Sequence, residues 1–211
     1  MKVLYCAGEQ ARVVLDILDR RDEADDVVVL DDDPDRHGER IGDAEVVGGS
    51  EKLPEFDAAE TRALVAFGAS QGVRLELAEL IRKRGIEFFE AIDDDATVSA
   101  TATLGEGVTI NAQTYVGPGV HLDDHVLVDS AVNLSHDVAV GAGSIVAPNA
   151  TLAGGVRVAA DAFVGAGATV RDHVEIGESA LVGAGSVVVE DVPPEATVAG
   201  VPAEPLEQSR R

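Results

Sequence analysis

The chain has 211 residues, with 39 acidic and 16 basic side chains, and its formal net charge at pH 7 is -23. This excess of negative charge argues against nucleic acids and anionic membranes as partners, because both require a basic surface. A single cysteine, Cys6, excludes an internal disulfide and a zinc cluster built from cysteines.

No segment of the chain has the length and composition of a targeting or membrane signal. The apolar stretch from Val3 to Ala7 is too short for a signal peptide, and no apolar run reaches the ~18 residues of a membrane span. We therefore expect a cytoplasmic protein. The hydrophobic content of 45% is ordinary, so the acidic excess is typical of the solvated shell of proteins from a salt-rich cytoplasm.

The first part of the chain alternates predicted strands and predicted helices. We predict strands over residues 2–5, 27–30 and 62–67, and helices over residues 9–20 and 71–84. The apolar face of the first helix consists of Val14, Ile17 and Leu18, and that of the second consists of Val73, Leu77, Leu80 and Ile81. Gly85 is expected as the C-cap of the second helix. This alternation predicts a small, parallel, Rossmann-like α/β domain over residues 1–90.

The second part of the chain repeats every six residues. Sixteen consecutive sixth positions, from Val98 to Val188, are all Val, Leu or Ile, and a small or β-branched residue lies two positions before each. The position after each is often glycine, which we interpret as permitting backbone conformations that other residues resist. These glycines are Gly105, Gly117, Gly141, Gly165, Gly177 and Gly183.

A period of six fits neither an α-helix nor simple strand alternation. It fits a coil that turns a corner after each short strand, with the aliphatic residue pointing inward and three hexads in each coil. We therefore predict a left-handed parallel β-helix of about five coils over residues 91–192. A proline-rich tail, residues 193–211, is expected to leave the coil.

His136 is the histidine whose neighbours indicate chemistry. It lies two residues after the inward Leu134, so its side chain should project outward from a corner, and Asp137 follows it directly. A neutral imidazole is a good proton acceptor near pH 7, and a nearby carboxylate raises its basicity. The pair predicts a general base that activates an amine or a hydroxyl for direct attack on a thioester.

The other nucleophilic and metal-ligating side chains give no comparable pattern. Four histidines are interpreted as surface residues: His37, His121, His125 and His173. Their spacing, with that of His136, does not match the zinc ligands of β-helix enzymes of the γ-carbonic-anhydrase kind, so we predict no metal site. Ser135 and Ser144 are ordinary hexad residues, and we predict no covalent nucleophile.

The first strand, turn and helix, Tyr5 to Ala11, could present backbone N–H groups to a phosphate. Asp31 and Asp32 follow the second strand, where an acid that binds a ribose or a base would lie. A plain strand–helix turn without a ligand is the alternative.

Together these features resemble the PglD/NeuD-type sugar acetyltransferases. The resemblance rests on the order of the two domains, on the His136–Asp137 pair within the β-helix and on the terminal segment Ala199 to Ala203, and it covers essentially the whole chain. It implies a homotrimer that transfers an acetyl group from acetyl-CoA to an amino or hydroxyl group of a nucleotide-activated or acidic sugar. Acetyl-CoA would lie in the cleft between neighbouring β-helices.

The resemblance also implies roles for individual residues. His136 would be the general base, and Asp137 the acid that raises its basicity. Acetyl-CoA contacts would fall on Ile145, Ala166 and Ala184, mainly through backbone atoms. Nucleotide-sugar contacts would fall on Gly8, Glu9, Gln10, Asp31, Asp32 and Gly68.

The chain departs from the family pattern in the half that would bind the sugar. Glu9 and Gln10 replace a glycine and a histidine of the usual turn, and Ser70 stands where an asparagine is common. Ile145 stands where some members have histidine. Two other functions are compatible with the sequence, namely a non-catalytic trimeric scaffold that binds a nucleotide sugar and a metal-dependent hydratase.

Overall fold

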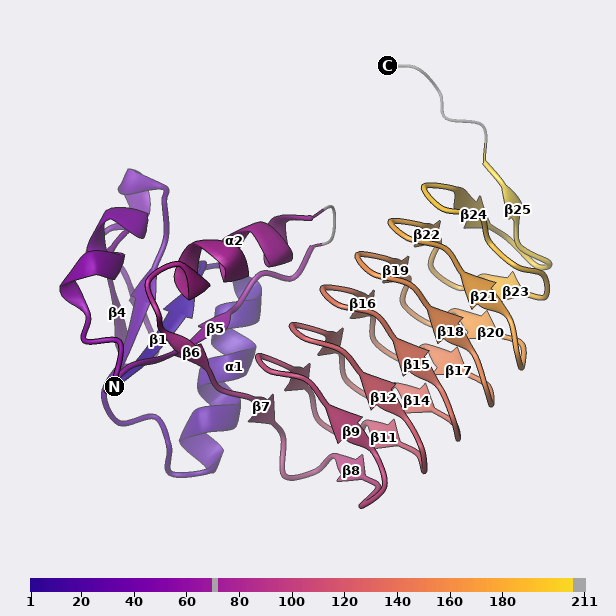
Figure 1. Cartoon of the computed structure of the whole chain (residues 1–211), viewed down its shortest axis with the longest axis horizontal. Coiled ribbons are helices and arrows are strands. Elements are labelled where there is room, and N and C mark those ends of the chain that lie inside the picture. The colour runs from indigo at the N-terminus through magenta and orange to yellow at the C-terminus, as the bar shows by residue number, and fades with distance from the viewer. Residues whose placement is uncertain (70–71, 207–211) are drawn as a thin grey trace. The chain divides into compact units, whose positions relative to one another are not determined.

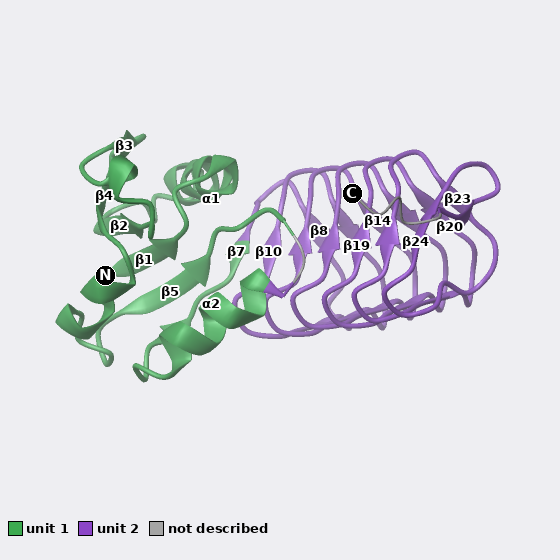
Figure 2. Cartoon of the chain, turned by 90° about the horizontal axis from the view of Figure 1, so that it is seen from above, with its two compact units in different colours: residues 1–69, 73–91 green, residues 70–72, 92–211 purple. Residues whose placement is uncertain are grey.

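The computed structural model describes residues 1–69 and 72–206. The chain divides into two compact units, which Figure 2 colours separately. Unit 1 comprises residues 1–69 and 73–91, and unit 2 comprises residues 70–72 and 92–211. Unit 1 is a mixed α/β structure, and unit 2 is the left-handed parallel β-helix that the six-residue period predicts.

Unit 1 is built on a six-stranded sheet. Its strands are β1 (Lys2–Tyr5), β2 (Val27–Leu30), β3 (Arg40–Ile41), β4 (Ala44–Gly48), β5 (Arg62–Val65) and β6 (Glu87–Phe88). Their order is β3-β4-β2-β1-β5-β6, and only the β3–β4 pair is antiparallel. The three predicted strands therefore form the centre of the sheet, and their carboxyl ends lie along one edge.

Two α-helices and two short 3-10 helices connect the strands of unit 1. They are α1 (Glu9–Arg20), α2 (Val73–Arg82), η1 (Pro34–Arg36) and η2 (Ser50–Glu55). α1 has the bounds predicted from the sequence. α2 ends two residues before its predicted end, and its predicted first residue, Gln71, lies outside the described residues. Gly85 follows α2 with a φ of 73°, a left-handed conformation that glycine adopts readily.

The central strands of unit 1 are buried on both faces. Leu4 packs in one cluster with Val14 of α1, whereas Val3 and Tyr5 pack in a second cluster with Ile81 of α2. Successive strand residues point to opposite faces, so one helix covers each side of the sheet. The predicted β5 ends at Val65, two residues early, and the edge strands β3 and β6 are only two residues long.

The strands of unit 2 stack in three faces, named here after their first strands (Figure 1). The β7 face contains β7 (Ala91–Ile92), β10 (Thr109–Ile110), β13 (Leu127–Val128), β16 (Ile145–Val146), β19 (Phe163–Val164) and β22 (Leu181–Val182). The β8 face contains β8 (Thr97–Val98), β11 (Tyr115–Val116), β14 (Asn133–Leu134), β17 (Thr151–Leu152), β20 (Thr169–Val170) and β23 (Val187–Val188). The β9 face contains β9 (Thr103–Leu104), β12 (His121–Leu122), β15 (Ala139–Val140), β18 (Arg157–Val158) and β21 (Glu175–Ile176).

The inward aliphatic residues form the core of unit 2. Each is the second residue of its strand, and from Ile110 to Val188 these residues are at most 3% exposed. Strands one coil apart pair in parallel, as Leu127 does with Ile145. Burying an aliphatic side chain of this size is worth about 1.5–3 kcal/mol, so the repeat itself supplies the stability of the coil.

The glycines that follow the inward residues are explained by close stacking, which corrects the interpretation from the sequence. None of the six has a positive φ. A Cβ on Gly141 would lie 2.6 Å from the backbone nitrogen of Ala160, and one on Gly165 would lie 2.6 Å from that of Ala184. A side chain at these positions would therefore press on the backbone of the next coil.

The left-handed backbone conformation falls two residues later in each hexad. From Gly107 to Gly185, every sixth residue has a positive φ. Glycine occupies several of these corners, and others carry residues such as Asp137 and His125, with φ values of 58° and 59°. Asp, Asn and His tolerate this conformation better than other side chains, so the corners accept polar residues.

The coil continues beyond Pro193, which corrects the prediction of a tail that leaves it there. Val192 forms a parallel bridge with Ile176, and β24 (Thr197–Ala199) pairs in parallel with β22. β25 (Glu204–Pro205) then pairs antiparallel with β24. In the described part of the chain, no helix is long and apolar enough to cross a membrane.

Candidate active site

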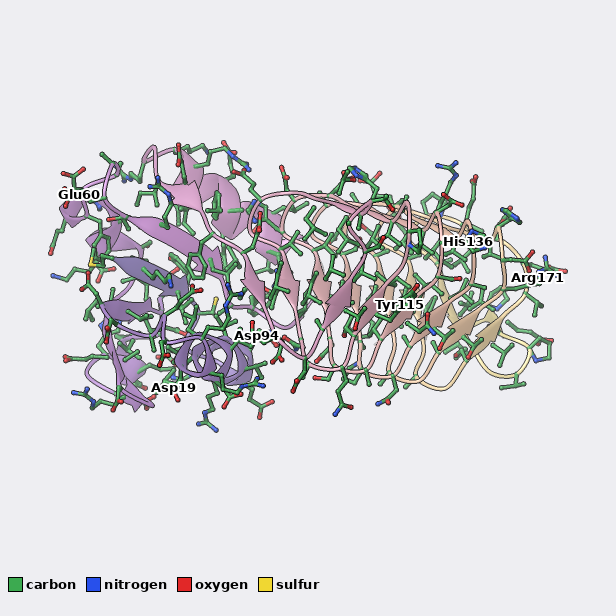
Figure 3. All side chains as sticks on the ribbon, turned by 90° about the horizontal axis from the view of Figure 1, so that it is seen from below. Asp19, Glu60, Asp94, Tyr115, His136 and Arg171 are labelled. Carbon is green, nitrogen blue, oxygen red and sulfur yellow. The ribbon has the colours of Figure 1, made fainter. Side chains whose placement is uncertain are left out.

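His136 lies at the corner where the chain passes from β14 to β15 (Figure 3). Its side chain is 63% exposed, and its Nδ1 lies 2.9 Å from Oδ2 of Asp137. A carboxylate can only accept a hydrogen bond, so Nδ1 must be the donor in this contact. The ring proton therefore lies on Nδ1, and the lone pair lies on Nε2. Nε2 of His136 is therefore the atom that can accept a proton.

Backbone hydrogen bonds hold this corner between the coils on either side. The Asp137 N–H donates to the Pro118 carbonyl at 2.9 Å, and the Gly155 N–H donates to the His136 carbonyl at 3.0 Å. The pair of side chains thus stands on a backbone that both neighbouring coils fix. Such a base needs little reorganisation before it accepts a proton.

The three residues expected at acetyl-CoA lie elsewhere on the coil. Ile145 begins β16 and is buried, at 2% exposure. Ala166 and Ala184 are exposed at one corner on successive coils, and the Gly185 N–H donates to the Ala166 carbonyl at 2.8 Å. A Cβ added to Gly167 or Gly185 would meet nothing within 4 Å, so this corner has open space beside it.

In one chain, these residues do not meet His136. His136 follows β14 and Ala166 precedes β20, and both strands belong to the β8 face. The two residues therefore lie at opposite edges of that face. The structure groups Ala166 with Ala184 but leaves the His136–Asp137 pair on the other corner.

In unit 1, Asp31 and Asp32 lie at the carboxyl edge of the sheet, directly after β2. Asp31 Oδ2 accepts the Ala7 N–H at 2.7 Å. Asp32 accepts from the Tyr5 hydroxyl at 2.8 Å and from the Ser50 N–H at 2.7 Å. Burial by itself would raise the pKa of Asp32, but these hydrogen bonds stabilise its charge and hold its pKa below the ordinary value.

The other residues expected to bind the sugar nucleotide surround the first turn of α1. Gly8 is the N-cap, no side chain caps it, and a Cβ there would meet nothing within 4 Å. Glu9 is exposed in the first turn, and Gly68 lies next to Gln10, since its Cβ would be 3.6 Å from that of Gln10. Among the described residues, Nε2 of Gln10 is a buried donor with no acceptor. The structure therefore brings these four residues together at one helix start.

Arg74 is a buried cation beside this edge, although its charge predicts an exposed position. Its guanidinium donates to the carbonyl oxygens of Val65 and Phe67, and burial lowers its pKa to about 10. The thiol of Cys6 is partly buried, and burial together with the nearby acids raises its pKa to about 12. The spacing of Arg74, Ala78 and Ile81 along one helical face is the signal that could have indicated this burial.

Among the other histidines, His125 departs from its interpretation as a surface residue, because it is 1% exposed. A Cβ on Gly107 would lie 2.4 Å from its Nδ1, so that glycine makes room for the ring. His121 is exposed, with Nδ1 2.6 Å from Thr103 Oγ1 and Nε2 2.8 Å from Asp123 Oδ1. Over residues 1–69 and 72–206, no three or more His, Cys, Asp or Glu side chains form a group that could hold a metal ion.

Comparison with known proteins finds relatives that match nearly the whole chain. A family model described as the PglD N-terminal domain matches residues 3–81. The chain is 30% identical to the acetyltransferase domain of PglB from Neisseria gonorrhoeae, with a TM-score of 0.92, and the match covers 97% of this chain and 98% of that one. A structure of that domain in complex with acetyl coenzyme A matches at 31% identity and a TM-score of 0.91, with the same coverage. No curated protein sequence matches the chain.

A second relative is bound to both CoA and GDP-perosamine. PerB from Caulobacter crescentus, in complex with CoA and GDP-perosamine, is 33% identical to this chain, with a TM-score of 0.91. The match covers 98% of this chain and 97% of PerB. Further structures of this perosamine N-acetyltransferase have asparagine or alanine in place of one histidine, again with CoA and GDP-perosamine bound.

Proposed function

This chain belongs to the PglD-type family of hexapeptide-repeat sugar acetyltransferases, and we propose that it transfers an acetyl group from acetyl-CoA to the amino group of a nucleotide-activated sugar. The observation that carries the proposal is the exposed His136 with Asp137 at its Nδ1. Relatives that are 30% or more identical over nearly their whole length include a domain bound to acetyl-CoA and a perosamine N-acetyltransferase bound to CoA and GDP-perosamine.

The reaction needs one base and no covalent enzyme intermediate. The acceptor nitrogen attacks the thioester carbonyl while Nε2 of His136 takes a proton from that nitrogen. The tetrahedral adduct collapses, the carbon–sulfur bond breaks, and the CoA thiolate leaves and takes up the proton. The Asp137 carboxylate stabilises the imidazolium that exists between these two proton transfers.

We further propose that each active site is formed by two copies of the chain. His136 and Ala166 lie at opposite edges of the β8 face, so we place acetyl-CoA between the His136 corner of one protomer and the Ala166 corner of another. In a closed ring, the His136 corner of one copy would face the Ala166 corner of the next. A homotrimer with its β8 faces toward the centre satisfies this requirement.

The outward side chains of the β8 face support that orientation. They are uncharged in all six strands, in a chain whose net charge is -23. They are Thr97, Tyr115, Asn133, Thr151, Thr169 and Val187. Tyr115, which is labelled in Figure 3, has an exposed fraction of 42% in the single chain. Interface cores are depleted in charged residues and enriched in tyrosine, so this face is suited to contact with other copies of the chain.

The acceptor nucleotide is assigned to unit 1, at the start of α1. Backbone N–H groups at a helix N-terminus bind phosphate, and Gly8 leaves open space at that point. The Gln10 Nε2 is a buried donor without an acceptor among the described residues, which a bound ligand would supply. Asp32, with its lowered pKa, is charged at neutral pH and can accept hydrogen bonds from a ribose or a base.

The test compares two exposed histidines, each of which has a carboxylate partner. His136→Ala is expected to lower turnover by about 10²–10⁴-fold, the usual contribution of a general base. His121→Ala, whose imidazole contacts Asp123 at 2.8 Å, is the matched control and should keep full turnover. Both variants should still be stabilised against heat by acetyl-CoA, because its contacts are assigned mainly to backbone atoms, which neither substitution removes.

Turnover is measured as CoA release with a panel of nucleotide-linked amino sugars, together with the mass of the product. Near-normal turnover by His136→Ala would rule out the assigned base. If wild-type protein gives no CoA release and no thermal stabilisation by acetyl-CoA, the chain is instead a non-catalytic scaffold that binds nucleotide sugars.

A further inference from the structure

Gly154 lies against the imidazole of His136, one coil further along the helix. A Cβ built on Gly154 would be 2.4 Å from Nε2 of His136, 2.5 Å from its Cε1 and 3.2 Å from its Cδ2. These three ring atoms are the nearest atoms that such a Cβ would meet. The ring therefore occupies the volume that any side chain at residue 154 would need.

The fold itself does not require glycine at this position. Gly154 is two residues after the inward Leu152, and its φ is outside the left-handed range. Of the sixteen hexads, this one alone has glycine two residues after the inward residue. Alanine occupies the same hexad position at Ala100, Ala112, Ala142, Ala160, Ala166 and Ala184. The backbone of the coil thus accepts a Cβ here, and only the His136 ring excludes it.

We propose that Gly154 is a positioning residue for the acetyl transfer, an inference that rests on the proposed role of His136. With Asp137 at Nδ1, the proton acceptor is Nε2, which is the ring atom nearest to the missing Cβ. A side chain at 154 would turn the ring away from Asp137 and would also obstruct the approach of the acceptor nitrogen to Nε2. The absence of a side chain therefore sets both the place of the base and access to it.

A second glycine makes the corresponding space for Asp137. A Cβ on Gly119, in the preceding coil, would lie 2.5 Å from Asp137 Oδ1. The pair is thus seated between Gly119 on one side and Gly154 on the other. Gly119 has a φ of 70°, so alanine there would add backbone strain to any effect on the pair. Gly154 is the cleaner position for an experiment.

The experiment is a double-mutant cycle with Gly154→Ala, His136→Ala and the double variant. Gly154→Ala is expected to lower kcat by about 100-fold, the cost of misplacing a catalytic group by about 1 Å. Its KM for acetyl-CoA and its melting temperature should stay unchanged. In the His136→Ala background, the same substitution should have no further effect on kcat, because Gly154 acts only through the ring.

A second measurement does not depend on turnover. NMR of protein labelled on the histidine ring nitrogens reads the His136 tautomer, and the His136→Ala spectrum identifies its signals. Gly154→Ala should shift the His136 signals and leave those of His121 unchanged.

The outcomes separate this inference from the proposed function. If Gly154→Ala keeps kcat and the His136 signals while His136→Ala loses turnover, the positioning role is wrong and the base assignment stands. An equal loss caused by Gly154→Ala in both backgrounds would also overturn it. Full turnover by His136→Ala overturns the base assignment instead, and the NMR shifts then still report whether residue 154 positions the ring.

Discussion

Asp137 adopts the left-handed backbone conformation next to His136, with a φ of 58°, and its Oδ2 lies 2.9 Å from His136 Nδ1. From residue 107 to residue 185, every hexad has a left-handed residue at this point, and most residue types are strained there. Aspartate tolerates the conformation, so one residue satisfies the backbone of the corner and orients the base.

Asp137→Asn should separate these two contributions. Asparagine also tolerates a positive φ, so the corner and the melting temperature should be preserved. Loss of the charge-assisted hydrogen bond should lower kcat about tenfold. This is the lower end of the range expected for hydrogen bonds to charged groups, because Asp137 is exposed. Steady-state kinetics with KM for acetyl-CoA as the internal control measure the change. A variant with unaltered kcat would mean that the carboxylate does not assist His136.

The sequence predicts those parts of the structure that depend on a regular spacing of apolar residues close together along the chain. The bounds of α1 follow from Val14, Ile17 and Leu18 on one face, and the coil follows from inward residues such as Leu134 at every sixth position. His136 is predictable for the same reason, because its distance from Leu134 fixes its place at a corner.

What the sequence does not predict depends on residues one coil or one strand away. His125 has the spacing of an exposed corner residue, yet it is buried because Gly107, eighteen residues earlier, leaves room for its ring. The role of Gly154 is visible only once His136 is placed beside it. Arg74 is buried although its charge indicates a surface position, and its guanidinium donates to the carbonyl oxygens of Val65 and Phe67.

Gly165→Ala tests the finding that glycines after the inward residues permit close stacking. The added Cβ would lie 2.6 Å from Val182 O and from Ala184 N, and neither backbone atom can move freely. We expect the free energy of unfolding to fall by about 3 kcal/mol, the upper part of the range for overpacking. Gly167→Ala is the control, since its Cβ would meet nothing within 4 Å and should cost only about 1 kcal/mol of left-handed strain. Denaturant unfolding without ligand measures both changes. A loss of unfolding free energy in Gly165→Ala equal to or smaller than that in Gly167→Ala would contradict the stacking explanation.

The thiol of Cys6 should be unreactive in the folded protein at pH 8. Burial, assisted by the charges of Asp31 and Asp32, raises its pKa from 9.0 to about 12. The thiolate is the reactive form, so a disulfide reagent should label Cys6 slowly in buffer and rapidly in denaturant. Rapid labelling of the folded chain would contradict this burial.

The same shift predicts how stability depends on alkaline pH. The unfolded chain releases the Cys6 proton near pH 9, whereas the folded chain retains it until about pH 12. The folded state therefore binds more protons within this window, and its stability should fall as pH rises from 9 to 12. Cys6→Ala should make that fall less steep, as measured by denaturant unfolding at several pH values. Parallel curves for the two proteins would show that Cys6 is not shifted.

Arg171 is the residue that we expect to bind the phosphates of acetyl-CoA. Arg157 and Arg171 are the only basic residues of unit 2 within its described part. Arg171 lies on the His136 side of the β8 face, two coils beyond that residue or about 10 Å along the axis, and is exposed (Figure 3). Arg157 is on the β9 face instead.

Arg171→Gln should raise KM for acetyl-CoA about tenfold, the value of one charge-assisted contact, and leave kcat unchanged. Arg157→Gln removes the same charge from the other face and should leave both constants unchanged. With acetyl-pantetheine as the donor, which has no phosphates, Arg171→Gln should have the same KM as the wild-type protein. Equal effects of the two substitutions would indicate a general influence of charge and not a contact.

Concentrated potassium chloride should stabilise the protein. Its 39 acidic and 16 basic side chains produce mutual repulsion that favours the unfolded state, and salt screens that repulsion. We expect the melting temperature to rise steeply at low salt and to level off near about 1 M, where the screening length falls to about 3 Å. A continuous rise through higher concentrations would indicate salting-out of apolar surface instead of screening. Scanning calorimetry across a range of potassium chloride concentrations distinguishes screening from salting-out. A melting temperature that falls with salt would show that repulsion between the acidic side chains does not destabilise the folded state.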